Sequence, residues 1–145
     1  MLYAAIVEDS ERDMSALKKH LERYGRETQQ EIKIAAFTQA ETFLQNYKAV
    51  YDVVFMDIML PYMDGMSAAE ELRKLDTEVA LIFATDMKQF ALKGYKVNAL
   101  DYFLKPVEYY DIKLRLDRIS MLKAASLPSV VIHIPGYGDK AMSSQ

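Results

Sequence analysis

The sequence predicts an α/β protein with an open, doubly wound parallel sheet of five strands. Five short apolar runs, at residues 2–8, 31–37, 52–57, 79–85 and 100–104, alternate with five stretches of helical periodicity. Strict alternation with short connections favours right-handed crossovers between parallel strands, with helices on both faces of the sheet. Periodicity alone leaves the order of the strands open.

The predicted strands are of two kinds. Four of the runs are almost continuous in Val, Ile, Leu, Phe and Ala, which is typical of strands covered on both faces. The run at 31–37 differs, because Glu31, Ile32, Lys33 and Ile34 alternate between charged and apolar side chains. This alternation predicts a strand at the edge of the sheet.

The first predicted helix has apolar residues three or four positions apart, and Gly25 follows them where a C-terminal cap is expected. A second helix is predicted to open with a capping box of Thr38 and Glu41 and to continue through Tyr47. A short fourth helix is predicted around residues 88–92, ending at Gly94. The apolar positions of the first, third and fifth helices are Met14, Leu17, Leu21 and Tyr24; Ala68, Leu72 and Leu75; and Ile112, Leu116, Ile119 and Leu122.

Composition limits the class of protein. The chain has 145 residues, 51% of them hydrophobic and 27% charged, which suits one soluble domain with its own core. It contains no cysteine, which excludes thiol catalysis and cysteine-ligated metals and fits a reducing cytoplasm. No apolar run approaches the ~20 residues of a membrane helix, and the start of the chain lacks the pattern of a secretion signal. A net charge of −3 gives no basic surface for nucleic acid. We therefore expect a cytoplasmic protein without membrane contact.

The character of the sequence changes after residue 125. Residues 127–129 resemble a linker, residues 130–134 a further strand, and residues 135–139 a turn. We expect residues 1–125 to form one domain. Residues 126–145 are then either a tail or the linker and first strand of a second domain.

Chemistry-bearing side chains stand at the carboxyl ends of four predicted strands. Glu8 and Asp9 end the first strand, Asp57 the third, Thr85 the fourth and Lys105 the fifth. Functional groups of open α/β sheets gather at this edge. Each residue alone has an ordinary explanation as a helix cap, a buried hydroxyl or a solvated charge, but their joint placement predicts a site.

The expected site binds a cation and a phosphoryl group. Three carboxylates in close proximity repel one another, and a hard divalent cation with oxygen ligands, Mg²⁺, relieves that repulsion. Asp57 is then placed to attack phosphorus as a nucleophile. Lys105 and Thr85 are placed to share the negative charge of the phosphoryl oxygens.

Three segments resemble the receiver domains of bacterial two-component response regulators. Residues 57–66 are similar to the phosphoacceptor signature of that family, residues 6–9 to its acidic start, and residues 102–106 to its switch aromatic and lysine. The resemblance covers about residues 2–125. It implies the flavodoxin-like strand order 2-1-3-4-5 and a cis peptide bond before Pro106.

The resemblance also implies roles for individual residues. Asp57 is the phosphoacceptor, and a histidine kinase is the phosphodonor. Mg²⁺ is held by Asp9, Asp57 and the backbone carbonyl of Met59, with Glu8 contributing through water. Thr85 and Tyr102 are the switch residues.

A narrower likeness concerns residues 91–102, which are similar to receivers of the LytTR class. The partner domain in that class is an all-β DNA-binding domain, and residues 130–134 would be its first strand. The resemblance thus implies a transcriptional regulator that contacts DNA only through a domain beyond this sequence. A stand-alone receiver that acts through protein contacts is the alternative.

Phosphorylation is expected to remodel the face made by the predicted fourth helix, fifth strand and fifth helix. A second copy of the chain or an effector would contact this face, through Tyr95, Lys96, Asp101, Tyr110 and Arg115. The chain is expected to be a switch rather than an enzyme, with phosphorylation and dephosphorylation of its own Asp57 as its only chemistry.

The sequence departs from the family pattern at two positions. Asp86 follows Thr85 where many receivers have a small residue, and we expect it to cap the fourth helix. Glu8 stands where an aspartate is also common.

Two other functions on this fold are disfavoured. A flavin or nucleotide binder needs a phosphate-cradling loop after the first strand, whereas Glu8, Asp9 and Glu11 would repel phosphate. A phosphatase of the haloacid dehalogenase type needs a second aspartate two residues after its nucleophile, where this chain has Met59.

Overall fold

The computed structural model describes residues 1–87 and 97–125. Within them, strands and helices alternate along the chain: β1 (Leu2–Val7), α1 (Glu11–Thr28), β2 (Ile32–Phe37), α2 (Ala40–Gln45), β3 (Val53–Met56), α3 (Gly65–Leu75), β4 (Ala80–Thr85), β5 (Asp101–Leu104) and α4 (Tyr109–Ala125). The helix predicted at 88–92 and the linker and strand predicted within 126–145 lie outside the described residues. The helix predicted as the fifth is α4.

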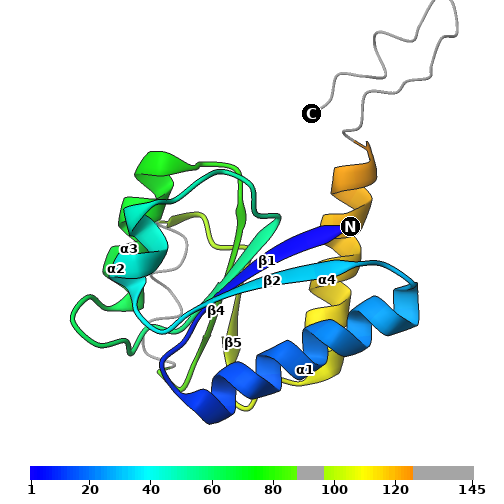
Figure 1. Cartoon of the computed structure of the whole chain (residues 1–145), viewed down its shortest axis with the longest axis horizontal. Helices are drawn as coiled ribbons and strands as arrows, with labels where there is room; N and C mark the ends of the chain where they lie inside the picture. The colour runs from blue at the N-terminus through cyan, green and yellow to red at the C-terminus, as the bar shows by residue number, and fades with distance from the viewer. Residues whose placement is uncertain (88–96, 126–145) are drawn as a thin grey trace, which may run out of the picture.

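The strands form one parallel sheet in the order β2-β1-β3-β4-β5. This order confirms the flavodoxin-like topology. Helices α1 and α4 cover one face of the sheet, and α2 and α3 cover the other (Figure 1). The carboxyl ends of all five strands therefore lie at one edge of the sheet, where the site was predicted.

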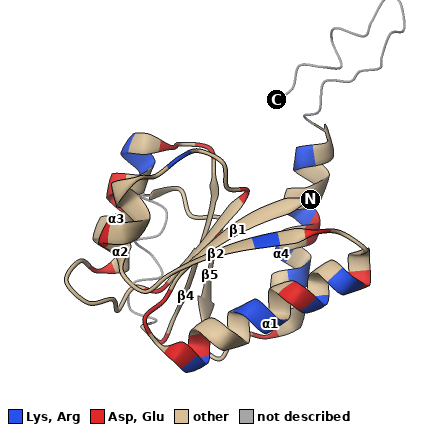
Figure 2. Ribbon diagram, in the orientation of Figure 1, with Lys and Arg blue, Asp and Glu red and all other residues tan. Residues whose placement is uncertain are grey.

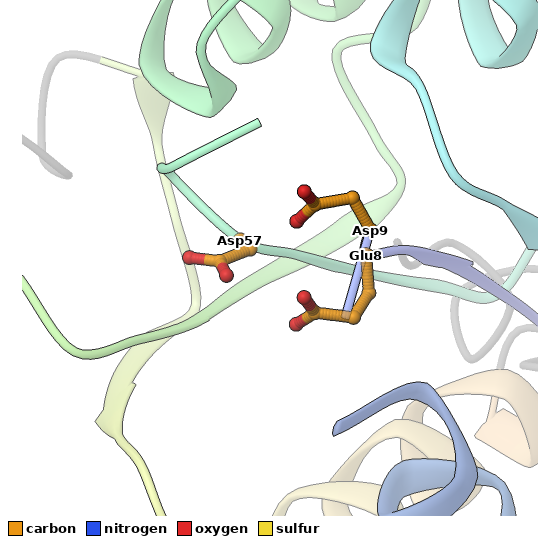
Figure 3. A group of neighbouring side chains, drawn as sticks. All are labelled: Glu8, Asp9 and Asp57. Carbon is orange, nitrogen blue, oxygen red and sulfur yellow. The ribbon is translucent and has the colours of Figure 1, made fainter. Parts of the chain in front are cut away.

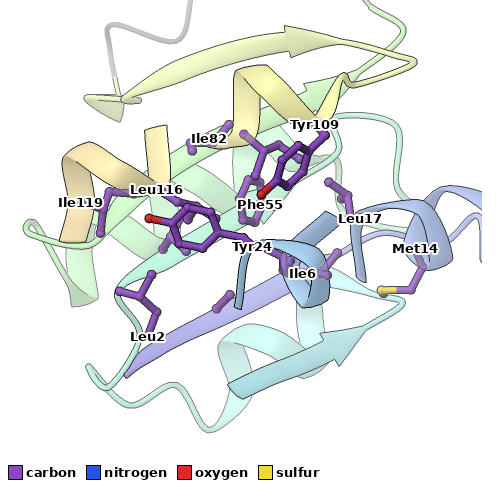
Figure 4. Close-up of a cluster of buried hydrophobic side chains, with 14 residues drawn as sticks. Leu2, Ile6, Met14, Leu17, Tyr24, Phe55, Ile82, Tyr109, Leu116 and Ile119 are labelled. Atoms are coloured by element: carbon purple, nitrogen blue, oxygen red, sulfur yellow. The ribbon is translucent and has the colours of Figure 1, made fainter. Parts of the chain in front are cut away.

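The strands divide their side chains between two buried clusters. Leu2, Ala4 and Ile6 of β1 belong to the cluster under α1 and α4 (Figure 4). Ala5 and Val7 of the same strand belong to the cluster under α2 and α3. Strands β1, β3 and β4 are thus covered on both faces, as their apolar runs predicted.

The two outer strands behave differently from the central ones. Strand β2 alternates between half-buried and exposed side chains at the edge of the sheet, as predicted. The prediction that the run at 100–104 is covered on both faces was wrong. Strand β5 is the other edge strand, its side chains are half-buried, and Leu104 is exposed. Its composition resembles that of a central strand because Phe103 packs against the cluster under α1 and α4 and Tyr102 against the cluster under α2 and α3.

The ends of α1 and α2 differ from the predicted ones. Helix α1 continues past Gly25 to Thr28, and Gln29 supplies the left-handed cap with φ 55°. Gly25 is needed for a different reason, since a Cβ there would lie 2.9 Å from the carbonyl oxygen of Gln30. The capping box was also wrong, because Gln39 is the N-cap of α2 and no side chain caps it. Helix α2 ends at Gln45, before Tyr47.

Two predicted core positions lie on the surface. Leu75 is 57% exposed at the end of α3, and Leu122 is 61% exposed near the end of α4. Ala68 and Leu72 of α3 and Ile112, Leu116 and Ile119 of α4 are buried, as predicted. Both exposed residues belong to the last turn of their helix, which ends at Leu75 in α3 and at Ala125 in α4. No helix in the described parts of the chain has the length and apolarity that crossing a membrane requires.

Candidate functional site

Two carboxylates, those of Glu8 and Asp9, follow β1 and lie at the edge of the sheet. The backbone N–H of Glu8 still donates to Phe37 in β2, at 2.9 Å, so the strand pairing holds Glu8 in place. Its side chain is buried, whereas that of Asp9 is exposed. Ser10 then caps α1 by accepting a hydrogen bond from the N–H of Asp13, and the Ser10 N–H donates to the Glu8 carboxylate at 3.0 Å. The start of α1 therefore fixes the orientation of Glu8.

Asp57 follows β3 directly and is held by the backbone on both sides. Its N–H donates to Val7 of β1 at 3.1 Å, and its Oδ1 accepts a hydrogen bond from the N–H of Met59 at 3.2 Å. Gly65, the first residue of α3, packs so closely that a Cβ there would lie 1.9 Å from the Asp57 carbonyl oxygen. The N–H of Gly65 also donates to Ile58 at 2.8 Å. The loop between β3 and α3 is thus drawn tightly against the candidate phosphoacceptor.

Glu8, Asp9 and Asp57 form one acidic cluster. Each contributes a carboxylate oxygen, and these oxygens all lie within 4.8 Å of one another. Figure 3 shows the three side chains close together at the ends of β1 and β3, with the carboxylates of Glu8 and Asp9 directed toward the side on which Asp57 lies. Acidic residues also gather at the beginning of α1, next to this edge of the sheet (Figure 2). The donor set consists of oxygens only, which fits a hard cation such as Mg²⁺.

Lys105 neutralises part of this charge from the end of β5. Its Nζ lies 2.7 Å from Oδ2 of Asp57, 2.8 Å from Oε1 of Glu8 and 2.8 Å from Oδ2 of Asp13. The lysine side chain is only 10% exposed, so water screens these contacts weakly. The peptide bond that follows, between Lys105 and Pro106, is cis, as the resemblance implied.

The acidic surroundings shift the protonation equilibria of the site. Burial raises the pKa of the Glu8 carboxyl, although the hydrogen bonds from Lys105 and from the Ser10 N–H act in the opposite direction. Burial alone would lower the pKa of Lys105, but its hydrogen bonds to Asp13, Asp57 and Glu8 outweigh burial and raise that pKa. Lys105 therefore remains a full positive charge at neutral pH.

The sequence reasoning missed Asp13. This residue belongs to the first turn of α1, and its hydrogen bond to Lys105 lowers the pKa of its carboxyl. The available signal was its place three residues after Ser10, but that spacing is typical of a capping box. A capping role would have directed the Asp13 carboxylate to the helix end rather than into the site.

The two predicted switch residues lie beside the site without joining the acidic cluster. Thr85 is buried, and its hydroxyl accepts a hydrogen bond from the N–H of Met87 at 3.3 Å. Its carbonyl accepts from the N–H of Lys105 at 2.9 Å, which links the ends of β4 and β5. Tyr102 is half-buried, its ring lies 5.8 Å from that of Phe83, and its hydroxyl donates to the Met87 carbonyl. Both residues thus converge on Met87.

The predicted contact face is described only in part. Asp101 of β5 and Arg115 of α4 form an ion pair with each other. Tyr110 is 65% exposed. Tyr95 and Lys96 lie outside the described residues. Asp86, expected to cap the predicted helix at 88–92, is exposed, and that helix is outside the described residues as well.

Comparison with known proteins identifies relatives. The chain is 36% identical over 89 residues to the sensory transduction protein LytR of Staphylococcus epidermidis, covering 61% of this chain and 35% of that protein. It is 39% identical over 77 residues to the sensory transduction protein LytT of Enterococcus faecalis, covering 53% of this chain and 32% of that protein. The chain thus spans about a third of the length of these curated relatives.

Solved structures share the fold. A response regulator receiver domain from Clostridium thermocellum superposes with a TM-score of 0.72 at 22% identity, covering 86% of this chain and 98% of that one. The response regulator DrrB of Thermotoga maritima superposes with a TM-score of 0.68 at 28% identity, covering 85% of this chain and 54% of that one. Residues 4–117 match the family described as the response regulator receiver domain. The chain therefore belongs to the response regulator receiver domain family, in agreement with the resemblance drawn from its acidic, phosphoacceptor and lysine segments.

Proposed function

We propose that this chain accepts a phosphoryl group on Asp57 from a histidine kinase and changes conformation in response. The observation that carries the proposal is the position of the Asp57 carboxylate. One of its oxygens contacts Lys105 Nζ at 2.7 Å, and Glu8 and Asp9 adjoin it. A nucleophile, a cation for the phosphoryl oxygens and ligands for a metal ion are then present at one edge of the sheet.

The transfer is a displacement at phosphorus. An oxygen of Asp57 forms a bond to phosphorus as the bond to the phosphodonor nitrogen breaks. The electron pair of that bond stays on the imidazole nitrogen of the kinase histidine, so the proton count of the receiver is unchanged. Lys105 holds one Asp57 oxygen and is placed to follow the phosphoryl oxygens, whose charge it neutralises.

Glu8, Asp9 and Asp57, with the backbone carbonyl of Met59, are the groups that we propose to hold Mg²⁺. When bound, Mg²⁺ neutralises charge on the phosphoryl oxygens during transfer. The burial of Glu8 and the exposure of Asp9 give this site a fixed side and a side open to solvent.

The switch that we propose runs through Thr85 and Tyr102. A phosphoryl group on Asp57 draws the Thr85 hydroxyl toward it, which breaks the hydrogen bond from the Met87 N–H. Because the Tyr102 hydroxyl donates to the carbonyl of the same Met87, movement there alters the packing of Tyr102. The signal would thereby reach β5 and α4.

The output that we propose is transcriptional control through a LytTR-type DNA-binding domain, because the curated relatives include LytR and LytT proteins about three times longer than the match. A stand-alone receiver that acts through protein contacts is the second candidate. In both cases the protein is cytoplasmic and is not an enzyme acting on a separate substrate.

Phosphorylation of Asp57 is directly testable with Mg²⁺ and acetyl phosphate. Intact-mass spectrometry should find one added phosphoryl group on the wild-type chain and none on Asp57→Asn. Asp64→Asn is the matched control, because Asp64 is exposed at the N-cap of α3 and asparagine caps equally well. Equal labelling of the wild type and Asp57→Asn would remove Asp57 as the phosphoacceptor.

Metal binding is testable without phosphate. Mg²⁺ should raise the melting temperature, because it relieves carboxylate repulsion that exists only in the folded state; at a hundredfold excess over Kd the gain is about 2.7 kcal/mol. Asp9→Ala should respond much less. Glu11→Gln removes a nearby exposed charge outside the acidic cluster and should respond like the wild type. An Asp9→Ala response as large as that of the wild type would exclude the proposed ligand set.

A further inference from the structure

Asp13 stands in a position where its carboxylate is normally used for capping. It is the third residue of α1, and its N–H donates to Oγ of the N-cap Ser10 at 3.2 Å. In a capping box the side chain at this position accepts a hydrogen bond from the backbone N–H of the N-cap residue. Here that N–H donates to Glu8 Oε2 at 3.0 Å instead. The Asp13 carboxylate is therefore released from the helix end and reaches Lys105, 92 positions away in the sequence.

The contact with Asp13 completes the coordination of the lysine. An ammonium group has three N–H donors, and Lys105 Nζ lies within 2.8 Å of three carboxylate oxygens, from Glu8, Asp13 and Asp57. A phosphoryl group on Asp57 adds further negative charge and several strong acceptor oxygens. Lys105 then has more acceptors than donors, and one carboxylate contact must weaken.

Asp13 differs from the other two partners of Lys105 in the interactions it makes apart from that lysine. Glu8 and Asp57 belong to the acidic cluster, whereas Asp13 does not. Its other ion pair is with Arg12, at 3.5 Å, but the Arg12 side chain is 88% exposed, and such surface pairs contribute little. Asp13 consequently depends on Lys105 for its stabilisation more than Glu8 or Asp57 does.

Space is available where this rearrangement would occur. A cavity of about 70 Å³ lies between α1 and the segment after β5, and Asp13 and Lys105 both line it. Leu17 and Pro106 also form its walls. This volume is large enough to admit a water molecule beside the two side chains.

We propose that Asp13 is a positioning residue that restrains the switch by competing with the phosphoryl group for Lys105. In the unphosphorylated chain it holds Lys105 in a fully occupied set of ion pairs. On phosphorylation the ion pair between Asp13 and Lys105 competes with the contact between the lysine and the phosphoryl oxygens. The phosphorylated state is therefore less populated than it would be without Asp13. This inference rests on the proposed phosphorylation of Asp57.

The experiment measures binding of beryllofluoride, a stand-in for the phosphoryl group, in the presence of Mg²⁺. Asp13→Asn should bind it about five- to tenfold more tightly than the wild type, since asparagine still accepts a hydrogen bond from Lys105 and only the difference between a charged and a neutral hydrogen bond is lost. Asp13→Glu restores the charge and should return toward the wild-type affinity. Glu11→Gln removes a charge from the same helical turn, on the exposed side, and should leave the affinity unchanged.

A second readout separates this role from a merely structural one. Mg²⁺ binding without beryllofluoride should be unchanged or weaker in Asp13→Asn, because Lys105 then lies closer to the acidic cluster. Loss of local structure would weaken both kinds of binding, whereas competition for Lys105 strengthens one of them alone. Thermal melts of each variant verify that the fold is intact.

The outcomes are distinct. If the wild type binds beryllofluoride and Asp13→Asn binds it equally or more weakly, Asp13 does not restrain Lys105. If the wild type binds no beryllofluoride and takes no label from acetyl phosphate, the proposed phosphorylation fails, and this inference fails with it. Tighter binding by both Asp13→Asn and Glu11→Gln would assign the effect to overall charge and would also overturn the proposal.

Discussion

The orientation of each side chain at the site is determined by the residues that surround it more than by its own residue type. Asp57 resembles many carboxylates that end a strand, but Lys105, Met59 and Gly65 surround it so closely that its orientation is determined. Gly65 is the clearest case, since its missing Cβ is what permits α3 to begin against the backbone of Asp57. The glycine of the phosphoacceptor segment therefore has a steric reason, independent of any turn conformation.

Gly65→Ala should destabilise the fold and disturb the site together. A Cβ placed 1.9 Å from the Asp57 carbonyl oxygen meets backbone rather than a flexible side chain, so α3 or the end of β3 must move. We expect a loss of about 3 kcal/mol, at the upper end of the usual cost of overpacking. Urea unfolding measures the loss, and the response of the melting temperature to Mg²⁺ should fall as well.

Gly25→Ala is the matched control for that experiment. Its new Cβ would lie 2.9 Å from the Gln30 carbonyl oxygen, but alanine also favours the helix by up to about 1 kcal/mol. This contact is also with backbone, so Gly25→Ala should lose stability too, but less than Gly65→Ala because the overlap is smaller. Mg²⁺ should still stabilise this variant as it does the wild type. A Gly65→Ala variant as stable and as responsive as Gly25→Ala would contradict the steric account.

The joints between secondary-structure elements depend on hydrogen bonds that span several of them. Asp76 ends α3 and illustrates this. Its Oδ2 accepts from the hydroxyl of Tyr47 at 2.7 Å, and its Oδ1 accepts from the N–H groups of Glu78 and Val79 at 2.9 and 3.0 Å. One carboxylate thus connects the segment after α2, the end of α3 and the approach to β4. Burial of Asp76 acts to raise the pKa of its carboxyl, but the hydrogen bonds outweigh burial and lower that pKa.

Asp76→Asn should lower the free energy of unfolding by about 1.5–3 kcal/mol at neutral pH, the range for hydrogen bonds to a charged group. Because the folded-state pKa of Asp76 is depressed, its stabilisation is present above the unfolded-state pKa of about 4. The stabilisation is lost as the pH falls through the folded-state value. The difference between wild type and variant should therefore shrink below about pH 4.

Urea unfolding from pH 3 to pH 7 measures this difference directly. Glu78→Gln is the control, since it removes a neighbouring exposed charge without removing the acceptor of the three hydrogen bonds. A difference between wild type and Asp76→Asn that stays constant over this pH range would show that the ionised carboxylate is not the stabilising form.

For the molecule as a whole, the site and the predicted contact face lie on connected elements. Strand β5 carries Lys105 at its end and borders α4, and its Asp101 pairs with Arg115 of α4. Three apolar side chains form an exposed stripe on α4: Tyr110, Leu114 and Met121. The spacing of four and seven residues places them on one side of the helix. We propose that this α4 stripe contacts a second copy of the chain after phosphorylation.

Phosphorylation should therefore drive self-association, which analytical ultracentrifugation measures with and without beryllofluoride and Mg²⁺. Leu114→Glu should prevent it, whereas Leu75→Glu, at an even more exposed apolar position on α3, should not. Thr85→Ala and Lys105→Ala should still take label from acetyl phosphate but associate about tenfold less, since each loses one charged hydrogen bond to the phosphoryl group. A fully labelled wild-type chain that stays monomeric would instead favour a receiver that binds a different effector.

The sequence predicts some of these structural features better than others. The five strands, the two-sided burial of β1, β3 and β4, and the gathering of Glu8, Asp9, Asp57 and Lys105 follow from alternation and periodicity, which are local patterns. Helix ends were predicted less well. Gly25 and the Thr38 capping box are local signals that packing overrode, because Ile32 and the Gln30 carbonyl, not a turn, require the glycine. The edge position of β5 also depends on strand order, which periodicity does not contain.

By itself, the sequence determined the fold class, the edge of the sheet at which the site forms and the chemical character of that site. Those conclusions follow from residue types at strand ends, and parallel strands necessarily bring their ends together. Only the tertiary structure decided which partners each charged group has. Asp13 reaches Lys105 because Glu8 already accepts the Ser10 N–H, and that competition takes place in space between residues far apart in the chain. A hydrogen-bonding group binds the partner that its neighbours leave available, and the sequence alone does not show which neighbours those are.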